Sequence, residues 1–234
     1  MNNILELEGN LFDAPENAAL IHACNCQGTW GKGIAETFRA KYPGAYRIYR
    51  AHCQKYLQQQ SKTSGRPIDS TAQGTEGSRE GSKRVLRSPE GTALLIPPQP
   101  EDYYVLLQEE TDTATEPRGK KRRRVNKCGG KQLAGKRHWI VCLFTSWHYS
   151  SKQKSSPEVI LENTTLALED LKRQLQDLEM TATDESRKPK ETPTDLWSCR
   201  FNAGLFGVPW QETKAVLEEA GLRVTVVRPV GECL

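Results

Sequence analysis

Apolar and polar positions along the first third of the chain follow two different periods. Residues Ile4 to Glu8 alternate between apolar and acidic, and residues Ala19 to Cys24 form a nearly continuous apolar run. Such a run is typical of a strand that is buried on both faces of a sheet. From Ile34 to Tyr42 and from Tyr46 to Leu57, apolar and aromatic residues recur at helical spacing, with a Pro-Gly pair between the two stretches. This part of the chain therefore predicts two strands followed by two helices.

The remaining pattern predicts further strands that alternate with helices. Two short apolar runs, Thr92 to Ile96 and Tyr103 to Leu107, are joined by a proline-rich connection and are expected to pair with each other as a hairpin. The elements that follow are a strand over His138 to Thr145, a helix over Pro157 to Leu178, a strand over Trp197 to Phe201, a helix over Trp210 to Ala220 and a strand over Arg223 to Arg228. Alternation of this kind predicts an α/β protein with three α/β/α layers and a mixed, mainly parallel central sheet.

Three polar stretches interrupt this pattern: residues 59–90, 109–137 and 181–195. They consist largely of Ser, Thr, Gly and charged residues, and such segments bury too little apolar surface to fold by themselves. We expect disordered insertions at the first two places and a polar spacer at the third. The chain is then a single domain over residues 1–234 that carries these insertions.

The positive charge of the chain is concentrated in one of these insertions. Ten Lys and Arg residues lie within residues 118–137 without an acidic residue, and without them the formal net charge of +4 would be −6. An acidic remainder argues against a nucleic-acid surface spread over the fold, so we expect no specific nucleic-acid partner. Residues Lys120 to Arg124 resemble a nuclear import signal, which makes an import receptor a candidate partner; an RNA-binding tail or a solubilising insertion are the alternatives.

The seven cysteines are odd in number and irregular in spacing, and no two of them form a CxxC pair. This usage indicates reduced thiols in an intracellular protein. The N-terminus lacks the pattern of a signal peptide, and no apolar run is long enough to cross a bilayer. We therefore expect a cytoplasmic or nuclear monomer with no membrane partner.

Candidate chemistry begins where the second predicted strand ends. Residues His22 to Ala35 read HACNCQGTWGKGIA and join a buried strand to a helix through three glycines. Glycines let backbone N–H groups turn toward a ligand, and a helix start adds partial positive charge, so such a loop can bind a diphosphate. No Lys-Ser/Thr pair follows Gly33, as a triphosphate-binding loop would require, and the dinucleotide fingerprint lacks its third glycine. An ordinary glycine-rich turn remains the alternative.

A second segment repeats this arrangement near the end of the chain. Residues Asn202 to Trp210 read NAGLFGVPW, with a predicted strand before them and a proline at the start of a helix after them. Both segments are expected to leave the sheet at the carboxyl ends of parallel strands, where α/β proteins bind ligands. One diphosphate could then lie between the two loops.

These two segments together resemble the macrodomains, and the resemblance extends to residues 8–11, to Tyr42-Pro43, to residues 142–146 and to the last helix. It implies the three-layer fold and an ADP-ribose-type ligand, ADP-ribose or ADP-ribose 1''-phosphate. The substrate-binding positions that it implies are Asn10, Leu11, Gly28, Gly31, Lys32, Gly33, Ile34, Thr145, Ser146, Asn202, Ala203, Gly204, Leu205, Phe206 and Gly207. Asn10 stands where most macrodomains have an adenine-binding aspartate; an amide oxygen can still accept a hydrogen bond, but carries no charge.

Two residues are candidates for the catalytic machinery, His22 and Asn25. The resemblance places Asn25 at the distal ribose of the ligand. An imidazole exchanges protons near neutral pH, so His22 could protonate a leaving oxygen or activate water. The alternative for His22 is a hydrogen-bonded histidine of the core. Cys24 and Cys26 are expected to be small buried thiols, and His148 is expected to pack within its loop rather than line the pocket.

The first functional hypothesis is hydrolysis of the terminal phosphate of ADP-ribose 1''-phosphate, a by-product of tRNA splicing, as the resemblance implies. The sequence has no Cys-x5-Arg loop, no Asp-x-Asp motif and no His/Asp cluster at metal-ligand spacing, so we expect neither a metal nor another cofactor. The second hypothesis is removal of ADP-ribose from proteins. Ser146 and Phe206 stand where one branch of such hydrolases uses a lysine and an aspartate, which argues against that route. A non-catalytic reader of ADP-ribose is the third.

Overall fold

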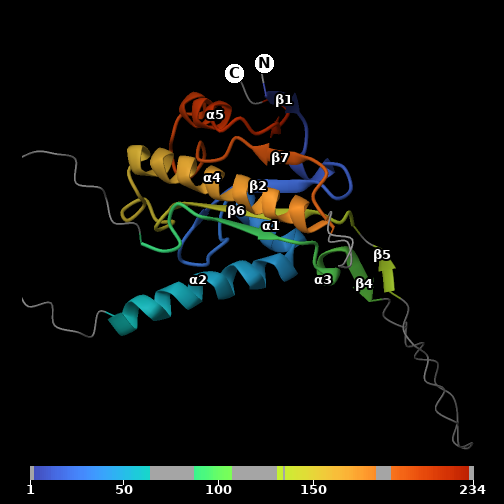
Figure 1. Cartoon of the computed structure of the whole chain (residues 1–234), viewed down its shortest axis with the longest axis horizontal. Helices are drawn as coiled ribbons and strands as arrows, with labels where there is room; N and C mark the ends of the chain where they lie inside the picture. The colour runs from blue at the N-terminus through green and yellow to red at the C-terminus, as the bar shows by residue number, and fades with distance from the viewer. Residues whose placement is uncertain (1–2, 64–86, 107–130, 134, 183–190, 232–234) are drawn as a thin grey trace, which may run out of the picture.

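The computed structural model describes residues 3–63, 87–106, 131–133, 135–182 and 191–231 (Figure 1). The basic residues 120–124 lie outside these ranges, as do most residues of the two predicted insertions and of the polar spacer. The described edges of these segments belong to the fold: helix α2 continues to Thr63, strand β5 covers Lys131–Leu133, and helix α4 continues to Ala182. Pro89 and Glu90 are buried. Among the described residues, no helix combines the length and apolar character needed to cross a bilayer.

The main sheet has six strands in the order β1-β8-β7-β2-β6-β3. In that order they cover Ile4–Glu8, Val224–Arg228, Leu196–Cys199, Ala19–Asn25, Trp139–Ser146 and Ala93–Ile96. Neighbouring strands run parallel except β3, which is antiparallel to β6. This confirms the mixed, mainly parallel sheet predicted from the alternation of strands and helices.

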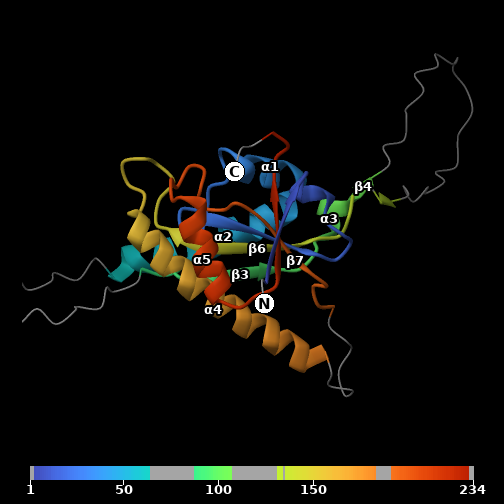
Figure 2. The same ribbon diagram turned by 90° about the horizontal axis from the view of Figure 1, so that it is seen from above.

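Helices cover both faces of this sheet and form the outer layers (Figures 1 and 2). Four helices make up these layers: α1 Ile34–Lys41, α2 Pro43–Thr63, α4 Pro157–Ala182 and α5 Trp210–Glu219. Leu20 and Cys24 of β2 pack in the cluster that contains residues of α1 and α2, whereas Ile21 packs in the cluster that contains residues of α4 and α5. A strand covered on both faces needs apolar residues at successive positions, which explains the continuous run after Ala19.

The predicted hairpin between Thr92–Ile96 and Tyr103–Leu107 is wrong. Strand β3 instead pairs with β6, with Leu94 opposite Cys142, and strand β4 (Tyr104–Leu106) pairs with β5 in a separate two-stranded sheet. Between β3 and β4 the chain forms the short helix α3 (Pro100–Tyr103). The physical reason lies in β6, which is buried at every position. Its outer edge must satisfy its backbone hydrogen bonds, and β3 supplies them.

Candidate ligand-binding and catalytic site

Two glycine loops leave the same edge of the sheet and meet there. The first glycine loop (residues 26–33) follows β2, and the second glycine loop (residues 200–209) follows β7, which is the parallel neighbour of β2. A Cβ built on Gly33 would lie 3.9 Å from Cδ1 of Leu205, so the two loops lie close to each other at this point. The expectation that both loops stand together at the carboxyl ends of parallel strands is confirmed.

Asn25, the last residue of β2, organises the first glycine loop from inside. Its side-chain Nδ2 donates to the carbonyl oxygen of Thr29 (2.6 Å), and its Oδ1 accepts from the backbone N–H of Gln27 (3.0 Å). From α2, the Tyr49 hydroxyl donates to the carbonyl oxygen of Asn25 (2.7 Å). Asn25 is buried. In this structure its side chain is therefore a scaffold for the loop, and its implied contact with a ribose stays a prediction.

The exposed end of the first glycine loop has the geometry of an anion-binding site. Gly31, Lys32 and Gly33 are exposed, and Gly33 is the N-cap of α1 with φ 60° and ψ −145°, a conformation that only glycine adopts without strain. The first N–H groups of α1 have no acceptor within the helix and carry partial positive charge. Gly28 has a different role, because a Cβ on it would lie 3.2 Å from Cβ of Cys53 on α2. Close packing and a positive φ of 70° account for glycine at this position, and its implied contact with the ligand stays a prediction.

The second glycine loop is fixed by buried side chains. Asn202 has a positive φ of 66°; its Oδ1 accepts from the Thr145 hydroxyl and its Nδ2 donates to the Thr164 hydroxyl, both at 2.9 Å. Thr145 and Ser146, two of the predicted substrate-binding residues, are fully buried. The Thr145 hydroxyl supports the second glycine loop through Asn202, whereas the Ser146 hydroxyl donates to the carbonyl oxygen of His148 (3.0 Å). Their implied contacts with the ligand stay predictions. The exposed members of the loop are Gly204, Leu205, Gly207 and Pro209.

Phe206 and Leu11, both expected near the ligand, point into the protein instead of standing free. Phe206 is 9% exposed and packs with Ile160 and Val208, and Leu11 is 4% exposed in the core. Asn10 is exposed and is the N-cap of a short 3-10 helix, where its Oδ1 accepts from the N–H of Phe12 (3.2 Å). Adenine recognition by Asn10 stays a prediction, and it would compete with this capping bond.

A third segment, which no pattern in the sequence marks, connects the two loops. The bridging loop (residues 147–156) lies between β6 and α4. On one side Gln27 Nε2 donates to the carbonyl oxygen of Trp147 (3.0 Å), and on the other Lys154 Nζ donates to the carbonyl oxygen of Phe206 (2.7 Å). A lysine in a polar connection gives no signal in the sequence, so only the three-dimensional contact reveals Lys154.

His22 lies in the core behind the first glycine loop, fully buried on β2. Its ring stacks on Phe38 of α1, with centroids 4.1 Å apart, and meets Trp30 of the loop edge-on at 4.9 Å. Trp30 in turn stacks on Tyr49 at 4.9 Å. These contacts describe a histidine packed among aromatic rings and linked to the loop through Trp30. Direct proton transfer by His22 stays a prediction.

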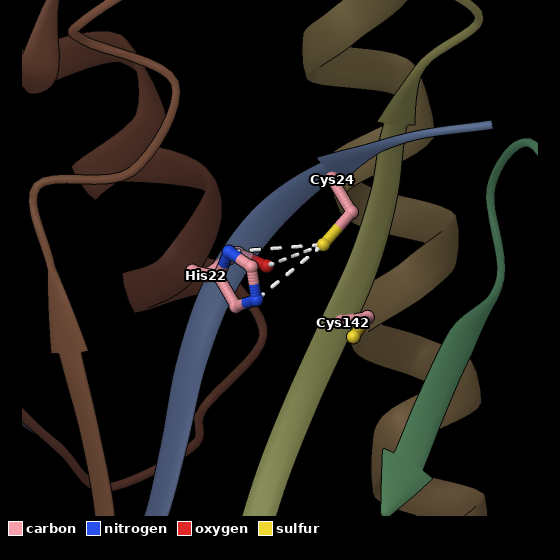
Figure 3. A group of neighbouring side chains, drawn as sticks. All are labelled: His22, Cys24 and Cys142. Carbon is pink, nitrogen blue, oxygen red and sulfur yellow. Dashed lines mark hydrogen bonds between the residues drawn. The ribbon is translucent and has the colours of Figure 1, made fainter. Parts of the chain in front are cut away.

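His22 also belongs to a compact group of potential metal ligands with Cys24 and Cys142 (Figure 3). Their ligand atoms lie within 4.8 Å of one another, and Cys24 Sγ is 3.5 Å from His22 Nε2. A thiol binds metal as the thiolate. Burial, followed by the neighbouring thiol of Cys142, raises the pKa of Cys24 well above its ordinary value. This environment favours neutral thiols, in keeping with the expectation for Cys24.

A separate cavity of about 590 Å³ lies near the start of β6, at the opposite end of the strands from the glycine loops. Its lining includes Leu95 of β3, Trp139 at the start of β6 and Leu178 near the end of α4. No residue of either glycine loop lines this cavity. Two carboxylates, those of Asp177 and Glu191, line it instead. Carboxylates repel a phosphate. The two glycine loops are therefore the stronger candidate for the functional site.

The three layers and the paired glycine loops define the chain as a macrodomain. Among solved structures, the macrodomain of DarG from Mycobacterium tuberculosis superposes with a TM-score of 0.54 over 97% of each chain, at 17% identity, which establishes the shared fold. No protein-family model matches the chain.

Curated relatives define the family more closely. A protein of Ajellomyces capsulatus, named ADP-ribose 1''-phosphate phosphatase, is 49% identical over 99% of this chain and 98% of its own length. A protein of the same name from Aspergillus fumigatus is 48% identical over 98% and 96%. The chain belongs to the ADP-ribose 1''-phosphate phosphatase family.

Proposed function

We propose that this chain hydrolyses the terminal phosphate monoester of ADP-ribose 1''-phosphate to ADP-ribose and inorganic phosphate. The observation that carries the proposal is the close approach of the two glycine loops at Gly33 and Leu205, at the carboxyl ends of two adjacent parallel strands. The names of the full-length relatives supply the reaction. The loops supply a site of the right chemistry.

In this proposal the diphosphate of the ligand lies between the loops and the α1 N-terminus. Backbone N–H groups that are already oriented bind the phosphate oxygens without reorganising at the moment of reaction. Such preorganised electrostatic stabilisation is usually the largest single contribution to enzymatic rate enhancement. Holding the nucleotide at its diphosphate also places the terminal phosphate in one position, and this lowers the entropic cost of attack by water.

His22 and Asn25 enter this proposal as residues that shape the first glycine loop. Asn25 bonds to two points of the loop, and His22 supports Trp30. Because His22 is fully buried, we infer that it affects turnover by holding Trp30 and α1 in place. Proton transfer by His22 remains the competing possibility, and it predicts a different mutant profile.

The test is phosphate release from ADP-ribose 1''-phosphate by the purified full chain, measured in chelator, with the nucleotide product identified by chromatography. We expect stoichiometric ADP-ribose and phosphate. ADP-ribose and a protein modified with ADP-ribose are offered in parallel.

Each alternative has its own result in the same assay. Release of ADP-ribose from the modified protein without phosphate release would replace the phosphatase with an ADP-ribosyl hydrolase. Tight binding of ADP-ribose without turnover of either substrate would make the chain a reader. Phosphate release that chelator abolishes would overturn the expectation of a metal-independent reaction.

A further inference from the structure

Lys154 of the bridging loop makes direct contact with the backbone of the second glycine loop. Its Nζ lies 2.7 Å from the carbonyl oxygen of Phe206 and 3.4 Å from that of Leu205. Lys154 is half-buried, whereas Lys152, two residues earlier in the same loop, is exposed. Hydrogen bonds from a charged donor are roughly twice as strong as those between neutral groups. The contact therefore constrains two consecutive peptide units of a loop that we assign to phosphate binding.

The position of these carbonyl oxygens determines where the N–H groups point. In a trans peptide the C=O and N–H bonds are antiparallel, so turning both oxygens toward Lys154 turns the N–H groups of Phe206 and Gly207 away from it. The Gly207 N–H closes the turn onto the carbonyl oxygen of Gly204 (3.0 Å). The Phe206 N–H is thus directed away from the lysine, as a donor to an anion on the other side of the loop would need to be.

Gly207 is fitted to the ammonium group of Lys154. Gly207 has a φ of +71°, in the left-handed region, and a Cβ built on it would lie 3.0 Å from Lys154 Nζ. A side chain at this position would be strained and would also push the ammonium group away from the carbonyl oxygens. The requirement for glycine here comes from the lysine as well as from the turn.

We propose that Lys154 is a positioning residue for substrate binding. This inference rests on the proposed function. Its ammonium group holds the second glycine loop in the conformation that binds a diphosphate. Its positive charge, transmitted through the polarised peptide units behind the loop, strengthens the amides that bind the anion. The residue acts on ligand affinity through the loop and need not touch the ligand.

The first experiment compares Lys154→Met, Lys154→Arg and the control Lys152→Met. For Lys154→Met we expect KM for ADP-ribose 1''-phosphate and Kd for ADP-ribose to rise roughly tenfold, while kcat changes by less than about threefold. Lys154→Arg keeps a cationic donor and should recover most of the lost affinity. Lys152→Met should match the wild type. Equal KM values for the Met variants at residues 152 and 154 would overturn the proposal.

A second variant tests the pair directly. Gly207→Ala should weaken ADP-ribose binding by a similar factor, and in the double variant Gly207→Ala/Lys154→Met the two losses should fail to multiply, because both break the same contact. Independent, multiplying losses would show that Lys154 does not act through the loop.

Hydrogen exchange of the ligand-free protein separates failure of this inference from failure of the proposed function. Lys154→Met should speed exchange of amides 204–208 relative to Lys152→Met, with amides of β2 unchanged. If the wild type binds no ADP-ribose, the proposed function fails whatever this exchange shows. If it binds and the exchange of amides 204–208 is unaltered in Lys154→Met, the role of Lys154 fails alone.

Discussion

The imidazole of His22 lies flat against the ring of Phe38, with the centroids 4.1 Å apart and the planes 11° from parallel. One ring belongs to β2 and the other to α1, whose N-cap is Gly33 of the first glycine loop. This stack therefore joins the strand before the loop to the helix after it. A change in the stack should move the loop.

His22→Phe and His22→Ala should have clearly different effects. Phe keeps an aromatic ring in the stack, so we expect a folded enzyme that retains most of its phosphate release. Ala leaves a cavity in the core and should lower the free energy of unfolding by about 2–4 kcal/mol, with turnover reduced through the disturbed loop. Denaturant unfolding and phosphate release, measured on both variants, check this.

If His22 instead transfers a proton, His22→Phe should abolish turnover while the protein stays as stable as the wild type and still binds ADP-ribose. The pH profile of kcat in the wild type, compared with that of His22→Phe, gives a second criterion. Profiles of the same shape support the packing role.

Asn25→Ala should impair ligand binding more than folding. The substitution removes the bonds that Asn25 makes to Gln27 and Thr29, and the loop loses its internal support. We expect kcat/KM for ADP-ribose 1''-phosphate to fall by at least about tenfold. Asn3→Ala, at the other end of the sheet, serves as the control in the same steady-state assay. Unchanged kcat/KM in Asn25→Ala would contradict the scaffold role.

Gly33→Ala and Gly31→Ala form a matched pair within the first glycine loop. Both glycines are exposed, but only Gly33 has a conformation forbidden to other residues, with φ 60° and ψ −145°. We expect Gly33→Ala to cost about 1–3 kcal/mol of stability and Gly31→Ala less than about 0.5 kcal/mol. Thermal and urea unfolding measure the difference, and equal losses would show that the backbone conformation of Gly33 is not as described.

Glu6 of β1 should make stability depend on pH. Burial alone would raise its pKa, but hydrogen bonds from Lys214 of α5 and Arg200 at the base of the second glycine loop outweigh burial and lower it. A carboxyl group whose pKa is lower in the folded state contributes stability above its unfolded pKa of about 4.3, and this contribution disappears as the pH falls through the folded pKa.

Glu6→Gln should therefore destabilise the protein by about 1 kcal/mol or less at pH 7, since the group is partly exposed, and the difference from the wild type should shrink below about pH 4. Urea unfolding at a series of pH values measures it, with Glu169→Gln, an exposed position in the middle of α4, as control. A constant difference across the series would mean that Glu6 acts through packing and not through its charge.

Much of the fold follows from periodicity, because strands buried on both faces and amphipathic helices carry strong local patterns. The run from Ala19 and the helical stripe from Pro157 both correspond to elements of the structure. The predicted hairpin was wrong because strand pairing depends on partners that are distant along the chain. Which edge β3 joins is decided by the unsatisfied backbone of β6, a partner more than forty residues away along the chain, and local pattern carries no information on such pairing.

The candidate site shows the same division between local and distant information. The two glycine loops could be predicted because a glycine-rich segment that follows a strand twice in one chain favours a ligand-binding edge over an ordinary turn. The burial of His22 could not be predicted, since an imidazole in an apolar run fits a core position and a catalytic one equally well. Lys154 gave no signal because its importance depends on Gly207, which lies in a different loop.

The place of β8 in the sheet links this site to the order in which the chain is synthesised. Among the described strands, β1 pairs with β8 alone, and β8 lies between β1 and β7. Because β1 is synthesised well before β8, it must wait for β8 before it can join the sheet. Until then β7, which carries the second glycine loop, has an open edge. A ribosome-bound chain that stops before Val224 should consequently be unable to retain ADP-ribose, so that ligand binding reports a finished sheet.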